Sequence, residues 1–451
     1  MKTPVSPRPT REILGDLADA GQARLIEILG RGVPPTVNGR YRHWDTLRQL
    51  TPPEGLSHEE WWLAIKLARR PLRQELPLAD RDGNPFGFVI TGEALRLLRQ
   101  VDRDASGQIT LSEDVATPEI RRRYLVSSLM EEAITSSQLE GAATSRRVAK
   151  DMIRSGRAPA TRDEQMILNN YRAMQRVRER LEEPLDPALV LELHRIVSEG
   201  TLDDARAAGR LQTPSEERVA IRDERGKVLF SPPPAEQLPY RLERLCAFAN
   251  GELDDHHYVH PVVRAILLHF WLGHDHPFLD GNGRTARLLF YWSLLRDGYW
   301  LIEHVSISRI LRGAPSQYAR SYLYSEWDDN DATYFVMHQL AVTTRAIEDF
   351  HDYLYRKMRE VRDTERLLDD LALNHRQIAL LSHALRHPDH RYTFRSHATS
   401  HGVVYQSART DLLQLEELGI LRRTRRGKTY HFRPVADVRG AIEGAATRQR
   451  T

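Results

Sequence analysis

The chain has 451 residues, of which 41% are hydrophobic and 28% are charged, and its formal net charge is +3 at pH 7. These values predict a soluble globular protein of two or three domains. No apolar run is long enough to cross a bilayer, and the single cysteine, Cys246, excludes a disulfide framework. Because the N-terminus lacks a signal core, we expect a cytoplasmic protein with no membrane partner, although secreted effectors can also lack such a signal.

The first 115 residues are predicted to form a helical extension. Aromatic and aliphatic side chains gather at Trp44 and around Trp61 and Trp62, which indicates packed helices. A buried core explains these aromatic residues better than a binding surface does.

Residues 102–113 fit the pattern of a calcium-binding loop, with Gly107 at its turn. The candidate oxygen ligands are Asp102, Asp104, Ser106 and Glu113. No second loop of this kind occurs, and Pro118 disturbs the helix that should follow. A short acidic loop is therefore the better interpretation.

Two further elements precede the most informative part of the chain. Apolar residues at helical spacing predict a helix over about 120–141 that ends near Gly141. The short runs 219–221 and 228–230 are separated by turn-forming residues, which predicts a β-hairpin over about 219–230.

Two apolar, helix-like runs follow, at 261–272 and 288–295. The residues Gly281-Asn282-Gly283 lie between them and cannot easily continue a helix, because glycine tolerates positive φ. The pattern predicts a helix, a tight loop and a second helix. The start of that second helix would offer its backbone N–H groups to an anion.

The residues around this loop have complementary chemistry. His276 titrates near neutrality and can act as a general base. Asp280 is a hard oxygen ligand that suits Mg²⁺. Arg284 and Arg287 share one face of the second helix and suit phosphate oxygens. A solvated helix hairpin would explain any one of these residues, but it does not explain all of them at this spacing.

The string from His276 to Arg287 resembles the signature of the Fic family, H-x-F-x-[D/E]-G-N-G-R-x-x-R, at every specified position. The resemblance implies AMP transfer from ATP to a hydroxyl of a target protein, with pyrophosphate released. It implies that His276 is the base and that Asp280 holds Mg²⁺, with Mn²⁺ as an alternative. The implied phosphate-binding residues are Gly281, Asn282, Gly283, Arg284 and Arg287.

A second resemblance lies upstream. Ser136, Glu140 and Gly141 match the family's inhibitory motif, [S/T]-x-x-x-E-G. The resemblance implies that Glu140 contacts Arg287 in the place of the γ-phosphate. It also implies that Val219, Ala220 and Ile221 belong to a flap that holds the target segment by strand addition. A surface helix end and a decorative hairpin are the alternatives for these two elements.

The C-terminal part is distinctly basic. Residues 374–434 contain eleven Lys and Arg but only four Asp and Glu. Three predicted helices, the third over 405–418, precede an alternating hairpin over 420–432. This order resembles the winged helix appended to many bacterial Fic proteins. Candidate DNA contacts are Tyr405, Gln406, Arg409, Arg422, Arg423, Arg425, Arg426 and Lys428. A protein-interaction module remains equally open.

We therefore predict a mainly α-helical Fic enzyme with a β-hairpin flap. The predicted segments are a helical extension (1–115), a Fic domain (116–345), a connecting helix (346–373), a winged helix (374–435) and a tail (436–451). The predicted partners are ATP, a protein with a Ser, Thr or Tyr hydroxyl, which can be the chain itself, and DNA. A homodimer is compatible with the resemblance. Transfer of UMP, phosphocholine or phosphate, removal of AMP, and a DNA-binding regulator with a ligand-sensing Fic domain remain alternatives.

Overall fold

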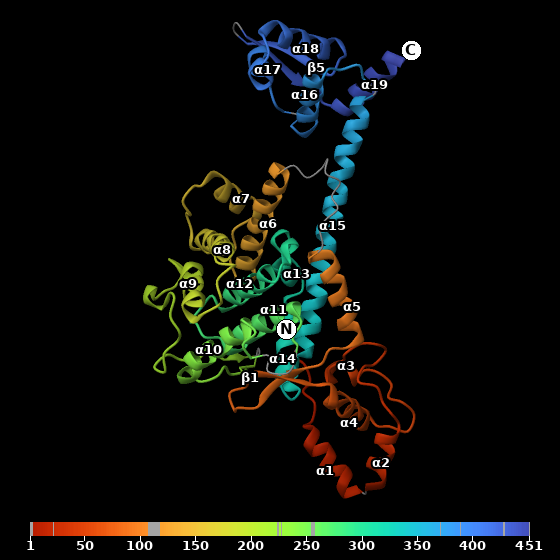
Figure 1. Cartoon of the computed structure of the whole chain (residues 1–451), viewed down its shortest axis with the longest axis vertical. Helices are drawn as coiled ribbons and strands as arrows, with labels where there is room; N and C mark the ends of the chain where they lie inside the picture. Colours follow the sequence, from red (N-terminus) through yellow and green to blue (C-terminus); the bar gives the residue numbers. More distant parts are fainter. Residues whose placement is uncertain are drawn as a thin grey trace. The chain divides into compact units, whose positions relative to one another are not determined.

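A computed structural model describes residues 3–20, 22–106, 118–222, 225–226, 228–253, 258–369, 371–387, 389–426 and 429–450. Over these residues the protein is mainly α-helical, as predicted, with three two-stranded antiparallel sheets. It divides into unit 1, Met1–Phe350, and unit 2, His351–Thr451 (Figure 1). A search of the described helices for a membrane-spanning segment found none.

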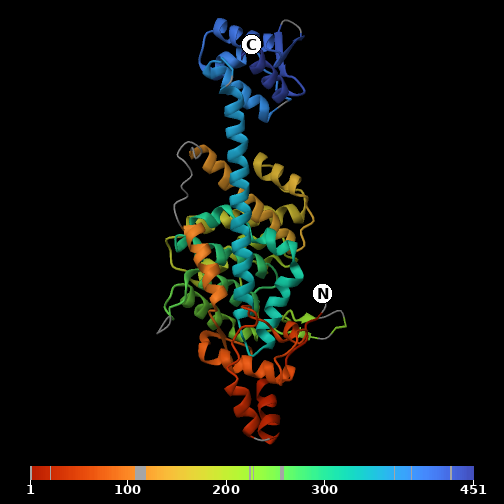
Figure 2. The same cartoon turned by 90° about the vertical axis from the view of Figure 1, so that its right-hand side faces the viewer.

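The N-terminal part of unit 1 consists of helices and one hairpin that was not predicted. The helices are α1 (Thr10–Ala20), α2 (Gln22–Gly30), α3 (Trp44–Leu47), α4 (His58–Arg69) and α5 (Gly92–Val101), and α1 and α2 lie at one end of the unit (Figure 2). The hairpin pairs β1 (Gln74–Ala79) with β2 (Pro85–Phe88). Asp80 stabilises its turn by accepting hydrogen bonds from the backbone of Asp82 and Asn84. Pro77 within β1 conceals the strand from pattern analysis.

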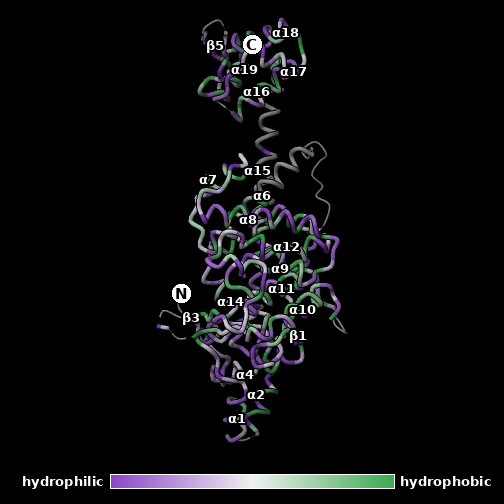
Figure 3. The backbone as a smooth tube through the Cα atoms, turned by 90° about the vertical axis from the view of Figure 1, so that its left-hand side faces the viewer, coloured by the Kyte–Doolittle hydropathy of each residue, from purple (hydrophilic) through white to green (hydrophobic). Residues whose placement is uncertain are grey.

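Two adjacent helices, α11 (Pro261–Asp275) and α12 (Asn282–Arg296), form the centre of unit 1. Nearly every side chain of both helices is buried, so they are central rather than amphipathic. The surrounding helices alternate hydrophilic and hydrophobic residues (Figure 3). They are α6 (Pro118–Leu139), α7 (Arg146–Ser155), α8 (Arg162–Glu179), α9 (Pro187–Ser198), α10 (Leu238–Ala249), α13 (Ile307–Gly313) and α14 (Pro315–Trp327).

A single long helix, α15 (Thr333–Asp369), occupies the segment where we predicted a domain end at 345 and a separate connecting helix over 346–373. The segment contains neither glycine nor proline, so nothing interrupts the helix. Its N-terminal half is also part of the core, since Phe335, Val336 and Leu340 are fully buried.

Unit 2 contains three helices, a hairpin and a last helix. They are α16 (His375–Arg386), α17 (Phe394–His401), α18 (Tyr405–Glu417), β5 (Leu421–Arg426), β6 (Thr429–Pro434) and α19 (Val438–Arg450). The expected tail over 436–451 is wrong, because α19 packs on the core of the unit. Val438, Ile442 and Ala445 lie three to four residues apart, which places them on one buried face.

Candidate active site

His276 is held in an unusual backbone conformation at the end of α11. Its φ and ψ are 48° and 52°, the left-handed region that few residues other than glycine adopt. Arg218 stabilises this turn from outside by donating hydrogen bonds to the carbonyl oxygens of Asp275 and His276. Such local strain is typical of functional sites.

The His276 side chain is half-buried, and burial lowers its pKa below the ordinary value of 6.5. Its Nδ1 lies 3.4 Å from the carbonyl oxygen of Gly273, which can only accept a hydrogen bond. The proton therefore belongs on Nδ1, which leaves a lone pair on Nε2. At neutral pH this imidazole is uncharged and can accept a proton.

The loop after His276 is fastened by Asn282. Its side chain accepts a hydrogen bond from the Phe278 N–H at 2.9 Å and donates one to the Phe278 carbonyl at 2.7 Å. These two bonds fix the side-chain amide of Asn282 against the loop, and its contact with phosphate stays a prediction. Its backbone N–H lies in the first turn of α12, where the start of a helix can bind an anion.

His194, which sequence reasoning missed, supports the same loop from α9. Its ring stacks on Phe278 with centroids 3.7 Å apart and an interplanar angle of 4°. Nδ1 accepts a hydrogen bond from the Gly209 N–H, so Nε2 carries the proton and donates to the Asp280 carbonyl at 2.9 Å. Burial lowers the pKa of His194 to about 4, which keeps it neutral. A histidine on the apolar face of α9 was its only sequence signal.

The start of α12 forms the floor of the site. Gly281 precedes the helix with a φ of 84°, and no side chain caps its first N–H groups. The predicted loop is shorter than expected, because Asn282 and Gly283 already belong to the helix. An uncapped helix of 15 residues presents free donors and a partial positive charge to an anion.

Arg284 and Asp280 lie beside this floor. Arg284 is fully buried, and it donates hydrogen bonds to the Val197 carbonyl at 3.1 Å and to the Asp280 carboxylate at 3.3 Å. The Asp280 side chain is 47% exposed, so a hydrated cation could reach it. No group of three or more metal-ligating side chains occurs among the described residues. Asp280 thus fits Mg²⁺ only if oxygen atoms of phosphate and water complete the coordination shell of the ion.

Glu140 lies over the same helix start. Arg287, which is 1% exposed, donates a hydrogen bond from Nη2 to Glu140 Oε1 at 2.8 Å. Its Nε donates to Ser136 Oγ at 2.9 Å, so Ser136 and Glu140 contact the same guanidinium. A Cβ at Gly283 would overlap Glu140 Oε1, so Gly283 lies directly beside this carboxylate. The Glu140 carboxylate therefore lies next to Gly283, at the start of α12.

Glu132, also missed in the sequence, anchors α6 so that Glu140 can reach Arg287. Its side chain is 2% exposed and accepts hydrogen bonds from the Ser306 hydroxyl at 2.7 Å and from the Ser308 backbone and hydroxyl. These groups lie at the start of α13. A buried carboxylate needs such donors, so this contact sets the position of α6 along its axis.

The flap hairpin pairs β3 (Ile221–Arg222) with β4 (Val228–Phe230). Val219 and Ala220 precede the first strand, which is shorter than predicted because Arg218 is held by the turn at His276. Trp327 of α14 fastens β4 by donating to the Leu229 carbonyl at 3.1 Å. About half of the Val219 and Ile221 surfaces is exposed, so the outer edge of β3 is accessible.

Some predicted residues fall outside these contacts. Residues 107–113 of the calcium-loop candidate lie outside the described residues, and Asp102–Ser106 is helical rather than a loop. Asp102 already accepts a hydrogen bond from the Tyr299 hydroxyl at 2.7 Å. Lys428 and the side chain of Arg426 are likewise outside the described residues.

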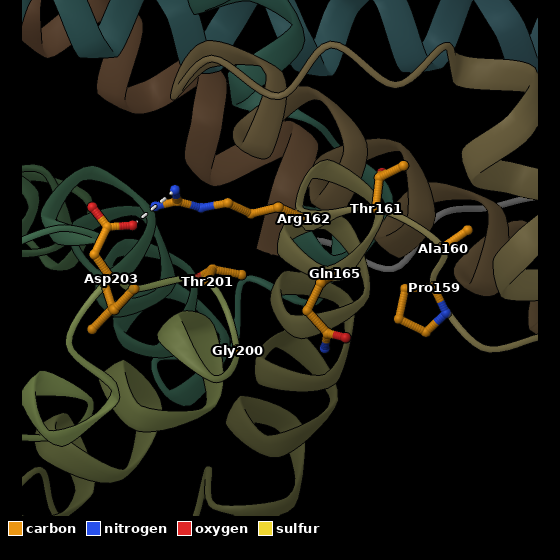
Figure 4. Close-up of a pocket in the computed structure, with 9 residues that line it drawn as sticks. Pro159, Ala160, Thr161, Arg162, Gln165, Gly200, Thr201 and Asp203 are labelled. Atoms are coloured by element: carbon orange, nitrogen blue, oxygen red, sulfur yellow. Dashed lines mark hydrogen bonds and ion pairs between the residues drawn. The ribbon is translucent and has the colours of Figure 1, made fainter.

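A separate polar cavity of about 320 Å³ lies between the start of α8 and the turn after α9 (Figure 4). An ion pair between Arg162 and Asp203 crosses it at 3.2 Å. None of the residues from His276 to Arg287 lines it, so it is not part of the candidate active site.

Comparison with known proteins agrees with this geometry. Residues 184–294 match the model of the Fic/DOC family. Over 68 residues the chain is 44% identical to the protein adenylyltransferase Fic of Drosophila grimshawi, and the match covers 15% of this chain and 14% of that protein. The corresponding protein of Drosophila yakuba is also 44% identical over 68 residues, which are 13% of its length. The chain thus spans a small part of these relatives.

A solved structure shows the fold. The Fic family protein from Desulfovibrio desulfuricans G20 superposes with a TM-score of 0.54 at 20% identity, over 77% of this chain and 97% of that one. The matched segment 184–294 includes the whole stretch from His276 to Arg287 and α9 with His194. Residues 184–294 of this chain therefore form a Fic/DOC domain.

Proposed function

We propose that this protein transfers AMP from ATP to a hydroxyl group of a protein and that Glu140 inhibits the transfer. The observation that carries the proposal is the position of one neutral base, His276, beside an uncapped helix start with two buried arginines. A base and an anion-binding site are the two parts that a reaction needs when it transfers a phosphate group to a hydroxyl.

The reaction follows from this arrangement. His276 Nε2 takes the proton of a Ser, Thr or Tyr hydroxyl while that oxygen attacks the α-phosphorus of ATP. The bond from the α-phosphorus to the bridging oxygen breaks, and pyrophosphate leaves with the electron pair. The N–H groups of Asn282 and Gly283 and the guanidinium of Arg284 stabilise the charge on the phosphates. Asp280 would hold Mg²⁺, which neutralises phosphate charge when bound.

The target would be held by the flap. The accessible edge of β3 offers backbone groups to an extended segment of another protein, and Ile221 and Val228 offer apolar contacts. Strand addition fixes the direction of the segment without demanding a particular sequence. The identity of the target hydroxyl is then set by its reach to His276.

Inhibition follows from the contact between Glu140 and Arg287. A carboxylate and a γ-phosphate both need the charged donors of Arg287 and the space next to Gly283. They cannot occupy that space together. Arg287 Nη1 is buried without a hydrogen-bond partner among the described residues, and this donor is suited to a phosphate oxygen.

The test is intact-mass spectrometry of wild type, Glu140→Gly and Glu140→Gly/His276→Ala after incubation with Mg²⁺ and ATP. We expect an AMP-sized increment that is larger in Glu140→Gly and absent in the double variant. ATP labelled at the α- or γ-phosphate identifies the group transferred, and only the α-label should be retained.

Each other result has a definite meaning. Equal modification of wild type and Glu140→Gly contradicts inhibition by Glu140. Modification of the double variant contradicts the role of His276. Retention of the γ-label would show phosphate transfer instead, and loss of AMP from previously modified protein would show the reverse reaction.

A further inference from the structure

Arg218 joins the flap to the end of α11 through four acceptor groups. Its Nε donates a hydrogen bond to the Pro233 carbonyl at 2.9 Å. Its terminal nitrogens donate to the carbonyl oxygens of Asp275, at 2.5 Å, and of His276, at 3.0 Å. Nη1 also donates to the side chain of Gln212. One guanidinium thus bonds to three separate segments of the chain.

The flap hairpin is fixed at both of its ends by this side chain. Arg218 directly precedes Val219, where the flap begins, and Pro233 follows β4, where the flap ends. Among the described residues, β3 and β4 share only two pairs of partners. A two-stranded hairpin of this length has little stability of its own. The position of the flap therefore depends on the contacts at its base.

The same guanidinium caps the C-terminal end of α11. The last carbonyl groups of a helix lack partners within the helix and carry partial negative charge. A cation that bonds to them satisfies these acceptors. At this helix end the backbone of His276 is left-handed, a conformation that persists only where the surroundings hold it. The hydrogen bonds from Arg218 to Asp275 and His276 hold the backbone on both sides of this strained position.

The partners of the guanidinium are themselves fixed in the core. The buried carboxylate of Asp275 accepts a hydrogen bond from Arg241 at 2.6 Å. Gln212 is also buried, and its backbone N–H donates to the Pro277 carbonyl at 2.9 Å. The end of α11 is thus rigid, and the flap is attached to it through one side chain.

We propose that Arg218 is a positioning residue that couples the flap to the base, so that a target segment on β3 and the imidazole of His276 keep one relative position. The inference rests on the proposed transfer of AMP to a protein hydroxyl. None of the partners of Arg218 belongs to the anion site at the start of α12. Loss of Arg218 should therefore lower the rate of transfer more than the affinity for ATP.

The coupling requires a guanidinium rather than a positive charge alone. The three nitrogens of arginine donate in fixed directions, which suits acceptors in separate segments, whereas lysine has all its donors on one atom. Arg218→Lys keeps the charge but not this geometry. It should therefore behave like Arg218→Ala, and it also serves as the second variant if Arg218→Ala does not fold.

The test measures initial rates of AMP transfer in Glu140→Gly, to which Arg218→Ala, Arg218→Lys or Arg206→Ala is added. Arg206 is the control, because it is an exposed arginine before the flap that pairs only locally, with Asp204. A displacement of about 1 Å can cost about 100-fold in rate, so both Arg218 variants should lower kcat about 10- to 100-fold. Their affinity for Mg·ATP, titrated in the His276→Ala background, should change less than about twofold. The control should change neither quantity.

Two further measurements separate positioning from a general loss of folding. Guanidinium chloride at millimolar concentration should restore part of kcat in Arg218→Ala, because the free cation can bond to the same carbonyl groups, whereas methylammonium chloride should not. Hydrogen exchange in Arg218→Ala should become faster over residues 218–222 and 228–233 of the flap. It should stay unchanged over residues 261–270 of α11.

Three results would overturn the proposal. One is a kcat in both Arg218 variants within about twofold of that in Glu140→Gly. Another is a parallel loss of kcat and ATP affinity, or an equal loss of kcat in the control. The third is unchanged hydrogen exchange of the flap in Arg218→Ala. Because exchange needs no activity, it still decides the coupling if Glu140→Gly transfers no AMP, a result that would count against the proposed function alone.

Discussion

Replacing Glu140 by glutamine should expose how strongly the inhibitory carboxylate competes with ATP. The substitution keeps the size of the side chain and one acceptor oxygen but removes the charge that faces Arg287. A hydrogen bond to a charged group contributes about 1.5–3 kcal/mol of free energy, and the Arg287 side chain in this bond is almost fully buried. Since about 1.4 kcal/mol corresponds to a factor of ten, ATP should bind about 10- to 150-fold more tightly.

The assay is isothermal titration of Mg·ATP into Glu140→Gln in the His276→Ala background, which prevents turnover during the titration. The matched control is Glu131→Gln, because Glu131 lies on α6, which leads to Glu140, but pairs with Arg146 and Lys150. The control should bind ATP as the His276→Ala parent does. Unchanged ATP affinity in Glu140→Gln, or an equal gain in the control, would refute competition at Arg287.

Three further predictions follow from the contacts of the site and of unit 2. Burial lowers the pKa of His276, and its neutral form is the base. The acid limb of the pH profile of kcat/KM in Glu140→Gly should therefore lie below pH 6.5. An acid limb above that pH would contradict the assignment of His276 as the base. His194→Ala removes the ring under Phe278 and should lower kcat about tenfold or more with a smaller change in ATP affinity, measured by initial rates and titration. Asp411→Ala should destabilise unit 2 by about 3–5 kcal/mol, measured by hydrogen exchange in α16–α18, while AMP transfer persists. Burial raises the pKa of Asp411, but hydrogen bonds from Arg376, Asn374 and His397 outweigh the effect of burial and lower the pKa to about 2. The stabilisation of unit 2 by the Asp411 carboxylate is therefore present above about pH 4 and is lost as the pH falls toward 2.

The sequence by itself determined the local structure of the site. Apolar runs separated by Gly281 predict two helices and a turn, because helix and turn preferences depend on neighbours within about four residues. The same spacing brings His276 to the end of one helix and Arg284 to the start of the next. The short strand β1 and the helix α19 were missed, since Pro77 and a basic composition obscured their patterns.

Only the tertiary structure decided which distant groups meet. Glu140 and Arg287 are separated by 147 residues, and their contact depends on the anchoring of α6 by Glu132. The stacking of His194 on Phe278 likewise depends on how α9 packs against the loop. In unit 2, strand alternation separates Arg422 from Arg423, but the packing of Phe432 decides which of them faces the helices. Local sequence preference contains no signal for such pairs, because packing brings them together. The contact between Glu140 and Arg287 was expected only through the resemblance of the motif that contains Ser136 and Glu140.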